Sequence, residues 1–530
     1  MATKRKSGKS RKTQQRYLGK PNGVIQPRVE EVGPEHFGIV AIDCAKARAK
    51  WMFCNFYGKV LVEPTRLSIG KGPLQLAVLQ VQQACEEHDI RDQIVAVEMT
   101  GTYHRPVQRA FRKAGFETRL VHPFASNHYR CPAHGDIKTD DNDLVAIFRA
   151  AVNGFGLLEL SVGEVYGKLQ LLARHRRDLV KKRSTLQCQI REFLGRCLPG
   201  YGALFPEDSL WQSHIAVPLV REYSNADAIR AAGVSALVKQ FRERRIHFQA
   251  RTIEKIVSWA GQAAAADPLA PVLQRIWCAL DDDRLAKCRQ IQEIERDLVD
   301  LFVLTPYVLL LTMPGINVIS GSEMAGGAPP AGWSGPITHY AHARAITGRA
   351  GLFPRRYQSD EVDRTGPLAR FRNHKLRAIW MLVAENLLRC NAYFRGKGRL
   401  WRDQDVDPRD IHTRIANRAT RVVFQIVSGG QVFQHPCGLN RDYLMEKLTD
   451  YCREHHIPPD HTLRLLHAAA DQIPKAARAD EAACVKTKFQ QTRRKSRKEP
   501  ESLGTLLVAV LAKLGAVELQ SNESEARGSD

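Results

Sequence analysis

Four acidic residues of this chain stand where apolar runs end or where a helix begins: Asp43, Glu98, Asp140 and Asp143. Asp43 and Glu98 each close a run that predicts a strand, and Thr139, before Asp140, is a residue type that caps helix N-termini. Carboxylate oxygens suit hard divalent cations, and two such ions about 4 Å apart can hold the attacking and leaving oxygens of a phosphoryl transfer. The residues therefore predict a magnesium-dependent phosphoryl-transfer site.

Each of these acids also has an ordinary structural explanation. Asp is common in the turn after a strand, and acids in the first turn of a helix interact favourably with its dipole. Helical periodicity does not choose between Asp140 and Asp141, because each shares a helix face with apolar residues further along. From the residues alone, that choice stays open.

The segments around the acids predict an α/β domain. Strands are expected over 37–42, 49–56, 59–62, 93–97 and 118–121, and helices over 75–87 and 104–114. Tyr57-Gly58 predicts the tight turn between the second and third strands. Three antiparallel strands followed by alternating helices and strands indicate an α/β sheet, in which Glu98 lies beside Asp43 if their two strands pair.

Helical patterns dominate the rest of the chain. Two long patterns, over 165–198 and 280–302, predict an antiparallel hairpin or coiled coil that flanks an insertion. Within this insertion, residues 240–251 predict a further basic helix. The uncharged run 301–322 is long enough to suggest a membrane span, but Pro306, Pro314 and Gly315 interrupt it, and we expect no membrane association.

Charge favours a nucleic-acid partner. The chain has 79 Lys and Arg against 56 Asp and Glu, a formal net charge of +23. Such a surplus predicts contacts with phosphates. Residues 1–28 and 486–498 predict basic disordered arms that bind nucleic acid; the alternative is that they are tails that only aid solubility. The twelve cysteines include no C-x-x-C pair and no signal peptide precedes them, so we expect reduced thiols in a cytoplasm.

Three motifs in the first part of the chain resemble the DEDD-type insertion-sequence transposases, often called the "IS one-ten" family. Residues 41–46, with Asp43, resemble its G-I-D-V-S-K-like motif; Glu98 to Tyr103 resembles E-x-T-G-x-Y; and Lys138 to Leu144 resembles K-T-D-x-x-D-A. The resemblance implies an RNase H or RuvC-like domain in a prokaryotic, nucleoid-associated protein. It selects Asp140 over Asp141, and it implies Mg²⁺, with Mn²⁺ as a substitute, held by Asp43, Glu98, Asp140 and Asp143.

The second half resembles the same family independently. Met313-Pro314-Gly315-Ile316 resembles the entry to a helix-hairpin-helix, residues 349–359 resemble G-L-x-P-x-x-x-x-S-G, and residues 371–377 resemble K-x-G-N-x-x-L-R. The resemblance implies that Ser359 is a nucleophile that becomes attached to a DNA 5′ phosphate. A serine hydroxyl needs a base or a metal for such an attack, so the site is expected to be composite.

The chain departs from the family pattern at four positions. Asp360 replaces the glycine after the serine, and the others are Ala45, Leu144 and Arg372. Asp360 matters most, because it removes backbone freedom and adds a negative charge beside a nucleophile that must approach a phosphate.

The predicted organisation has five parts: a basic disordered arm (1–34), a RuvC-like metal-binding domain (35–160), a helical or coiled-coil linker with an insertion (161–303), a mostly α-helical transposase domain with a helix-hairpin-helix (304–434) and an extension with a basic tail (435–530). DNA, a structured guide RNA and a second copy of the chain, in a dimer or tetramer, are the expected partners from the resemblance. Basic residues expected to contact nucleic acid are Lys46, Lys138, Arg174, Arg177, Lys181, Arg355, Arg356, Arg370, Arg372, Lys375 and Arg377.

Three alternatives remain open. A metal-dependent junction nuclease would use the same carboxylates with water as the nucleophile. A non-catalytic derivative of a transposase would bind nucleic acid without cutting it. Separately, a group of cysteines and histidines suggests a zinc site, although its spacing matches no standard finger; its members are His435, Cys437, Cys452, His455, His456 and His461.

Overall fold

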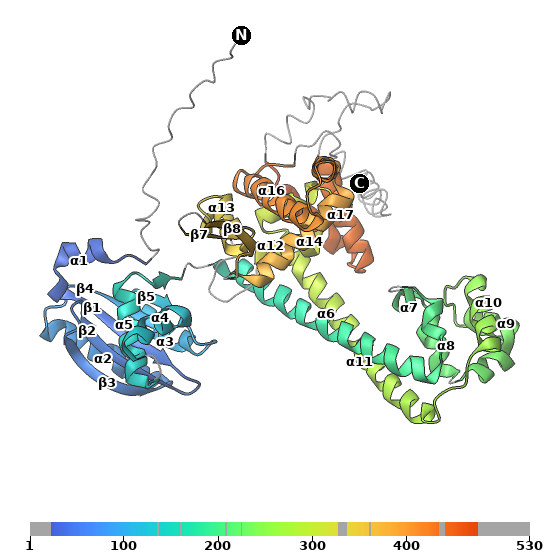
Figure 1. Ribbon diagram of the computed structural model, residues 1–530, viewed down its shortest axis with the longest axis horizontal. Helices are drawn as coiled ribbons and strands as arrows, with labels where there is room; N and C mark the ends of the chain where they lie inside the picture. The colour runs from blue at the N-terminus through green and yellow to red at the C-terminus, as the bar shows by residue number, and fades with distance from the viewer. Residues whose placement is uncertain are drawn as a thin grey trace, which may run out of the picture. The chain divides into compact units, whose positions relative to one another are not determined.

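The computed structural model describes residues 23–134, 137–159, 162–206, 209–223, 225–326, 336–359, 362–370, 372–433 and 440–474. The chain divides into two compact units, residues 1–161 and 162–530. The first is built on a mixed β-sheet and the second is mostly helical (Figure 1).

A six-stranded sheet forms the centre of the first unit. Its order is β3-β2-β1-β4-β5-β6. Strands β1, β2 and β3 are antiparallel neighbours, β4 and β5 run parallel to β1, and β6 is antiparallel to β5. The strands are β1 (Phe37–Cys44), β2 (Arg48–Asn55), β3 (Val60–Ser68), β4 (Asp92–Glu98), β5 (Thr118–Val121) and β6 (Gly156–Leu158). The predicted α/β class, the first five strands and the turn at Tyr57-Gly58 are therefore confirmed.

The helices of this unit are α1 (Gln26–Val32), η2 (Pro34–His36), α2 (Lys71–Glu87), α3 (His104–Lys113), α4 (Pro123–His134) and α5 (Asp140–Val152). Helix α5 packs on one face of the sheet, where Leu144 and Ile147 join the alternate strand residues Ile39, Ala41 and Ala96 in one buried cluster. Because strand side chains alternate between faces, Asp43 and Glu98 continue this same face.

The first helix corrects the predicted disordered arm of residues 1–34. Residues 26–32 fold as α1, and the Arg28 guanidinium bonds the carboxylates of Asp92 at 2.7 Å and Glu117 at 2.8 Å. Val29 is buried in the sheet cluster, so this segment has an apolar anchor as well as ionic ones. Residues 1–22 of the predicted arm lie outside the described residues.

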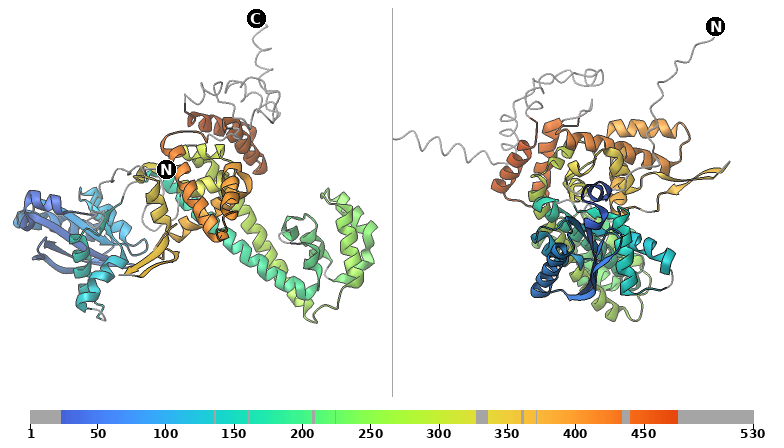
Figure 2. Two further views of the ribbon diagram at one scale, coloured as in Figure 1. Left: turned by 45° about the horizontal axis from the view of Figure 1, so that its top comes forward. Right: turned by 90° about the vertical axis from the view of Figure 1, so that its left-hand side faces the viewer.

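Two long helices, α6 (Gly163–Cys197) and α11 (Ala270–Phe302), pack against each other in the second unit (Figures 1 and 2). Arg176 bonds Glu295 at 2.5 Å, while Arg196, near the other end of α6, bonds Asp267 just before α11. The two helices therefore run in opposite directions, and the predicted antiparallel hairpin is confirmed.

A separate helical group fills the predicted insertion. It consists of η3 (Tyr201–Leu204), α7 (Ser209–Gln212), α8 (Ala216–Glu222), α9 (Ala226–Glu243) and α10 (Ala250–Gln262). The prediction of a helix over 240–251 is wrong, because α9 ends at Glu243 and Arg245 adopts a left-handed conformation with φ 53°. The turn lets Ile246 and Phe248 pack against the core of this group.

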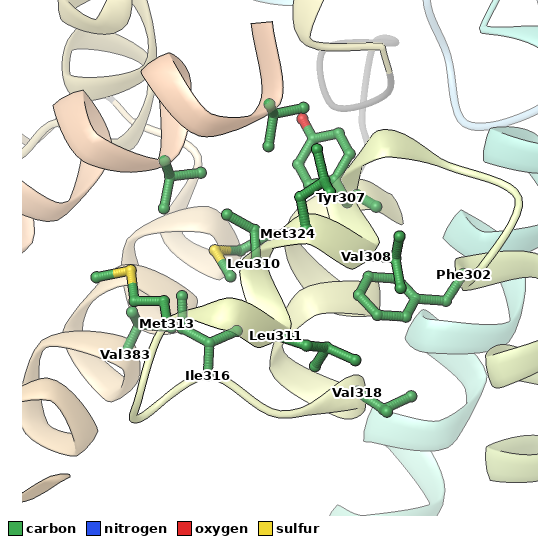
Figure 3. Close-up of a cluster of buried hydrophobic side chains, with 14 of the residues drawn as sticks. Phe302, Tyr307, Val308, Leu310, Leu311, Met313, Ile316, Val318, Met324 and Val383 are labelled. Carbon is green, nitrogen blue, oxygen red and sulfur yellow. The ribbon is translucent and has the colours of Figure 1, made fainter. Parts of the chain in front are cut away.

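The other end of the long hairpin packs into a helical core. Phe302, Tyr307, Leu310 and Met313 lie in this core beside residues of later helices (Figure 3). Gly321 is required here, because a β-carbon at that position would lie 2.5 Å from the Phe302 ring. The elements are η4 (Pro306–Thr312), α12 (Val318–Gly326), η5 (Ile337–His339), α13 (Ala343–Ala350), α14 (His374–Cys390), α15 (Ala392–Arg402), α16 (Pro408–Ser428), α17 (Asn440–Glu454) and α18 (Pro459–Asp471).

The Met313-Pro314-Gly315-Ile316 motif forms the turn between η4 and α12. Gly315 has φ 96°, which favours glycine. From α17, the Lys447 ammonium donates to the carbonyls of Met313 at 2.9 Å and Ile316 at 2.6 Å. Burial lowers the pKa of Lys447 to about 7. Hydrogen bonds from a C-terminal helix therefore hold this turn in place.

A two-stranded hairpin interrupts the helices of the second unit: β7 (Pro354–Ser359) and β8 (Val362–Leu368). All of β7 is exposed, and the hairpin projects from the helical body (Figure 2). No helix in the described part of the chain is long and apolar enough to cross a membrane.

Candidate active site

The sheet brings Asp43 and Glu98 together at the ends of adjacent parallel strands. Ile42 of β1 is in register with Val97 of β4, so Asp43 and Glu98 are the next neighbours along the two strands. The rest of β1 is buried, and Asp43 is its one partly exposed residue. Thr139 caps α5, accepting a hydrogen bond from the Asn142 amide at 3.2 Å, which positions Asp140 and Asp143 in the first turn.

Three of the predicted acids act electrostatically on the fourth, Asp43. The pKa of Asp43 is raised to about 6, first by burial and then by the charges of Glu98, Asp143 and Asp140. Repulsion between close carboxylates disfavours full ionisation, and a bound cation relieves it. This donor set is chemically suited to a divalent metal.

Glu98 is oriented by two hydroxyl groups. The Ser126 hydroxyl, from α4, donates a short hydrogen bond to one carboxylate oxygen. The Thr100 hydroxyl donates to the other at 3.2 Å. Thr100 belongs to the predicted E-x-T-G-x-Y motif, whereas Ser126 is contributed by a segment that the sequence did not single out.

Asp143 is paired with a cation that sequence reasoning missed. Arg130 of α4 bonds Asp143 at 2.7 Å, and both side chains are largely buried. Lys138 lies 3.9 Å from the same carboxylate but is mostly exposed. Among the described residues, no three His, Cys, Asp or Glu side chains are placed to hold a metal as they stand. Arg130 therefore competes with any cation that binds Asp143.

The neighbouring acid, Asp141, is engaged elsewhere. Its carboxylate lies 2.6 Å from the ammonium of Lys50 on β2. It is also absent from the charges that raise the pKa of Asp43. These contacts separate Asp141 from Asp140, a choice that periodicity left open.

Ser359 ends β7, where it is exposed and pairs with Val362 of β8. The base of this hairpin is held by Arg377, which donates to the carbonyls of Ala350, Gly351 and Ala369 at 2.5 to 3.0 Å. Gly351 has φ 62°, and a β-carbon there would lie 2.6 Å from the Arg377 guanidinium. The absence of a side chain at Gly351 therefore leaves room for the Arg377 guanidinium.

Two parts of the chain match known transposase families. Residues 40–199 match a DEDD transposase family named for IS110, and residues 307–398 match the family described as transposase IS116/IS110/IS902. The chain is therefore similar to this transposase family in two separate regions. A 44.8 kDa uncharacterized protein of insertion element IS116 from Streptomyces clavuligerus is 24% identical over 219 residues. The match covers 41% of the chain and 52% of that protein, so the chain spans about half the length of this relative.

Most of the basic residues predicted to bind nucleic acid fall into two groups. Several are engaged within the protein: Arg356 with Asp363, Arg177 with Glu323, and Arg372 and Arg377 with backbone carbonyls. Others have exposed side chains: Lys46, Lys138, Arg174, Lys181, Arg355 and Arg370. The pKa of Lys375 is lowered, first by burial and then by Arg174, so these two cations are close neighbours.

The suggested zinc site is not supported in the part that the structure describes. His455 uses both ring nitrogens, one at 2.9 Å from the Tyr451 carbonyl and the other at 2.8 Å from Glu295. Cys452 is buried in the helical core, and no metal-binding group of His, Cys, Asp or Glu occurs among the described residues. His435 and Cys437 lie outside the described residues.

Proposed function

We propose that the chain is a DNA transposase that cuts and rejoins the ends of a mobile insertion sequence. The carboxylates Asp43, Glu98, Asp140 and Asp143 hold a divalent metal, Mg²⁺ or Mn²⁺, and Ser359 is the nucleophile. The observation that carries this proposal is the gathering of the acids at the ends of β1 and β4 and the start of α5, where Glu98, Asp143 and Asp140 act electrostatically on Asp43. The matches to transposase families indicate that the substrate is DNA.

The strand order supports an RNase H or RuvC-like first domain. Three antiparallel strands lead to two that are parallel to the first, and the acids stand at the strand ends, where α/β sheets place their ligands. A divalent metal supplies charge stabilisation to a phosphate undergoing substitution. The acids themselves orient the metal, and Ser126 and Thr100 fix the direction of the Glu98 carboxylate.

In the proposed reaction, the Ser359 hydroxyl oxygen forms a bond to a phosphorus atom of DNA. The bond from that phosphorus to the 3′ oxygen of the preceding nucleotide breaks, and the departing oxygen gains the proton that the serine loses. The product is a serine linked to a 5′ phosphate and a free 3′ hydroxyl. Attack by a 3′ hydroxyl on this linkage reverses the step and joins the strands, so no external energy source is needed. We further propose that a guide RNA selects the DNA and that the chain acts as a homo-oligomer.

The test is a search for a covalent adduct. The full-length chain, with any RNA that copurifies, is incubated with Mg²⁺ and labelled DNA carrying the junction of its element, then denatured. We expect a labelled protein band that disappears in Ser359→Ala and in Asp43→Asn but persists in Thr365→Ala, a change on the same hairpin. Cleavage without an adduct would identify a nuclease that uses water, and binding without cleavage would identify a non-catalytic derivative; either result contradicts the proposal.

A further inference from the structure

The two faces of the β7–β8 hairpin differ in composition. The strand register pairs Ser359 with Val362 and Tyr357 with Arg364. A β-carbon at Gly366 would lie 3.8 Å from that of Arg355, so Arg355 is on this side as well. Because successive strand residues alternate between faces, the serine face consists of Arg355, Tyr357, Ser359, Val362 and Arg364. The opposite face consists of Arg356, Gln358, Asp363 and Thr365.

Charge is neutralised on the opposite face but not on the serine face. Arg356 bonds Asp363 through two nitrogens, one of them at 2.8 Å. Arg355 and Arg364 are exposed, and neither forms an ion pair within the part of the chain that the structure describes. Among the residues that the structure describes, the serine face therefore presents two arginines and no acid.

An aromatic side chain accompanies these arginines. Tyr357 is 64% exposed, and Val362, on the same face of the hairpin, is 39% exposed. A two-stranded hairpin is marginal by itself, so exposed apolar groups are not explained by its own stability. Aromatic rings that stack on bases and arginines that contact phosphates are the usual components of surfaces that bind single nucleic-acid strands.

We propose that the serine face binds the DNA strand that reacts. Arg355 and Arg364 contact phosphates on either side of the one attacked, and Tyr357 packs against the adjoining base or sugar. Arg356 serves only to brace the hairpin. The inference rests on the proposed function for the identity of the attacked phosphate, but its claim about which face meets DNA stands on the hairpin register and charge.

Photo-crosslinking tests which face meets DNA without requiring catalysis. A photoreactive amino acid is placed singly at 357, 364, 358 or 365 in the full-length Ser359→Ala chain, which is then irradiated with a DNA duplex carrying the element junction. We expect crosslinks to DNA from 357 and 364, and a yield at least about fivefold lower from 358 and 365. Equal yields from the two faces, or crosslinks from 357 to copurified RNA alone, would overturn the inference.

A matched pair of substitutions tests the role of charge. Arg364→Ala should weaken binding of the junction DNA to the Ser359→Ala chain several-fold. It should also reduce the slope of the logarithm of the binding constant against the logarithm of the salt concentration by about one, because one phosphate contact is lost. Arg364→Lys should retain most of the binding, and Thr365→Ala should leave it unchanged. Equal effects of Arg364→Ala and Thr365→Ala would contradict the proposal. If the adduct persists in Ser359→Ala while these binding results hold, the nucleophile assignment fails and the binding face remains.

Discussion

The carboxylate group and the serine hairpin are supported in different ways. Asp43 and Glu98 extend from strands whose central residues are buried, and Glu98 and Asp143 each have a fixed partner in Ser126 and Arg130. Ser359 lies on a ladder that is exposed along its length and held at its base by Arg377. The fold therefore determines the positions of the acids closely, whereas the position of the serine depends on one anchored end.

This difference separates two kinds of mutational effect. Changes among the acids alter a crowded, charged cluster and should affect both stability and activity. Changes on the hairpin remove no buried contact and should affect activity alone.

The largest expected effects come from Asp43→Asn and Ser359→Ala, which should both abolish activity but differ in their effect on stability. Each should reduce adduct formation by about 10³-fold or more, since one removes a metal ligand and the other the nucleophile. Asp43→Asn should also raise the free energy of unfolding of the metal-free protein at neutral pH by roughly 1 kcal/mol, because the ionised Asp43 is disfavoured by burial and by Glu98. Ser359→Ala should leave it unchanged. Thermal unfolding without metal measures both, and a loss of stability in Asp43→Asn would count against the comparison.

The next effect concerns the anchor of the hairpin. Arg377→Ala leaves three backbone carbonyls without their donor and should lower the free energy of unfolding by about 2 kcal/mol. Adduct formation should fall about tenfold or more, because the hairpin loses its fixed base. Arg389→Ala, on the same helix, removes an exposed arginine paired with Glu385 and serves as the control. Similar losses in both variants would show that the hairpin does not depend on this anchor.

Metal binding should depend on pH through Asp43. Its pKa is about 6 in the folded protein and 3.8 in the ordinary carboxyl group, so the folded state binds this proton more tightly. The metal-free protein should consequently lose stability as pH rises from about 4 to above 6. Metal must displace the proton, so Mg²⁺ affinity should fall up to about tenfold per unit below pH 6. Calorimetry at pH 5 and 7.5 measures this, and equal affinities at the two pH values would refute it.

The smallest effect should come from Arg130. Arg130→Ala frees Asp143 and should tighten Mg²⁺ binding a few-fold, because the metal no longer competes with the guanidinium. Lys138→Ala should have a smaller effect, since this ammonium is 3.9 Å away and mostly exposed. Isothermal titration with Mg²⁺ compares the two variants. Weaker metal binding in Arg130→Ala would mean that the arginine supports the site instead of competing for it.

The sequence predicted the strands that are buried, because a short run of neighbouring apolar residues marks each of them. The runs 37–42 and 93–97 are mostly apolar because their strands lie inside the sheet, and the acids that follow them, Asp43 and Glu98, are visible from the sequence. The ion pair that distinguishes Asp141 from Asp140 involves Lys50, which is distant along the chain and reaches Asp141 only through the packing of α5 on the sheet. No local pattern contains that contact.

The hairpin was not predicted as a strand pair for a physical reason. Its residues are exposed on both faces, so no alternation of apolar and polar residues marks it, and Pro354 and Pro367 are atypical of strand interiors. Arg130 was missed for another reason. It lies on a helix between motifs, and its role depends on the approach of α4 to α5.

The ammonium of Lys447 has a consequence for any attempt to shorten this protein. The matched family region ends at residue 398, yet Lys447 holds the turn at Met313 and Ile316 from well beyond it. A fragment cut at the family boundary would expose two carbonyls and the apolar side of η4, on which α17 packs. A shortened chain that is meant to keep the second unit folded should therefore retain α17.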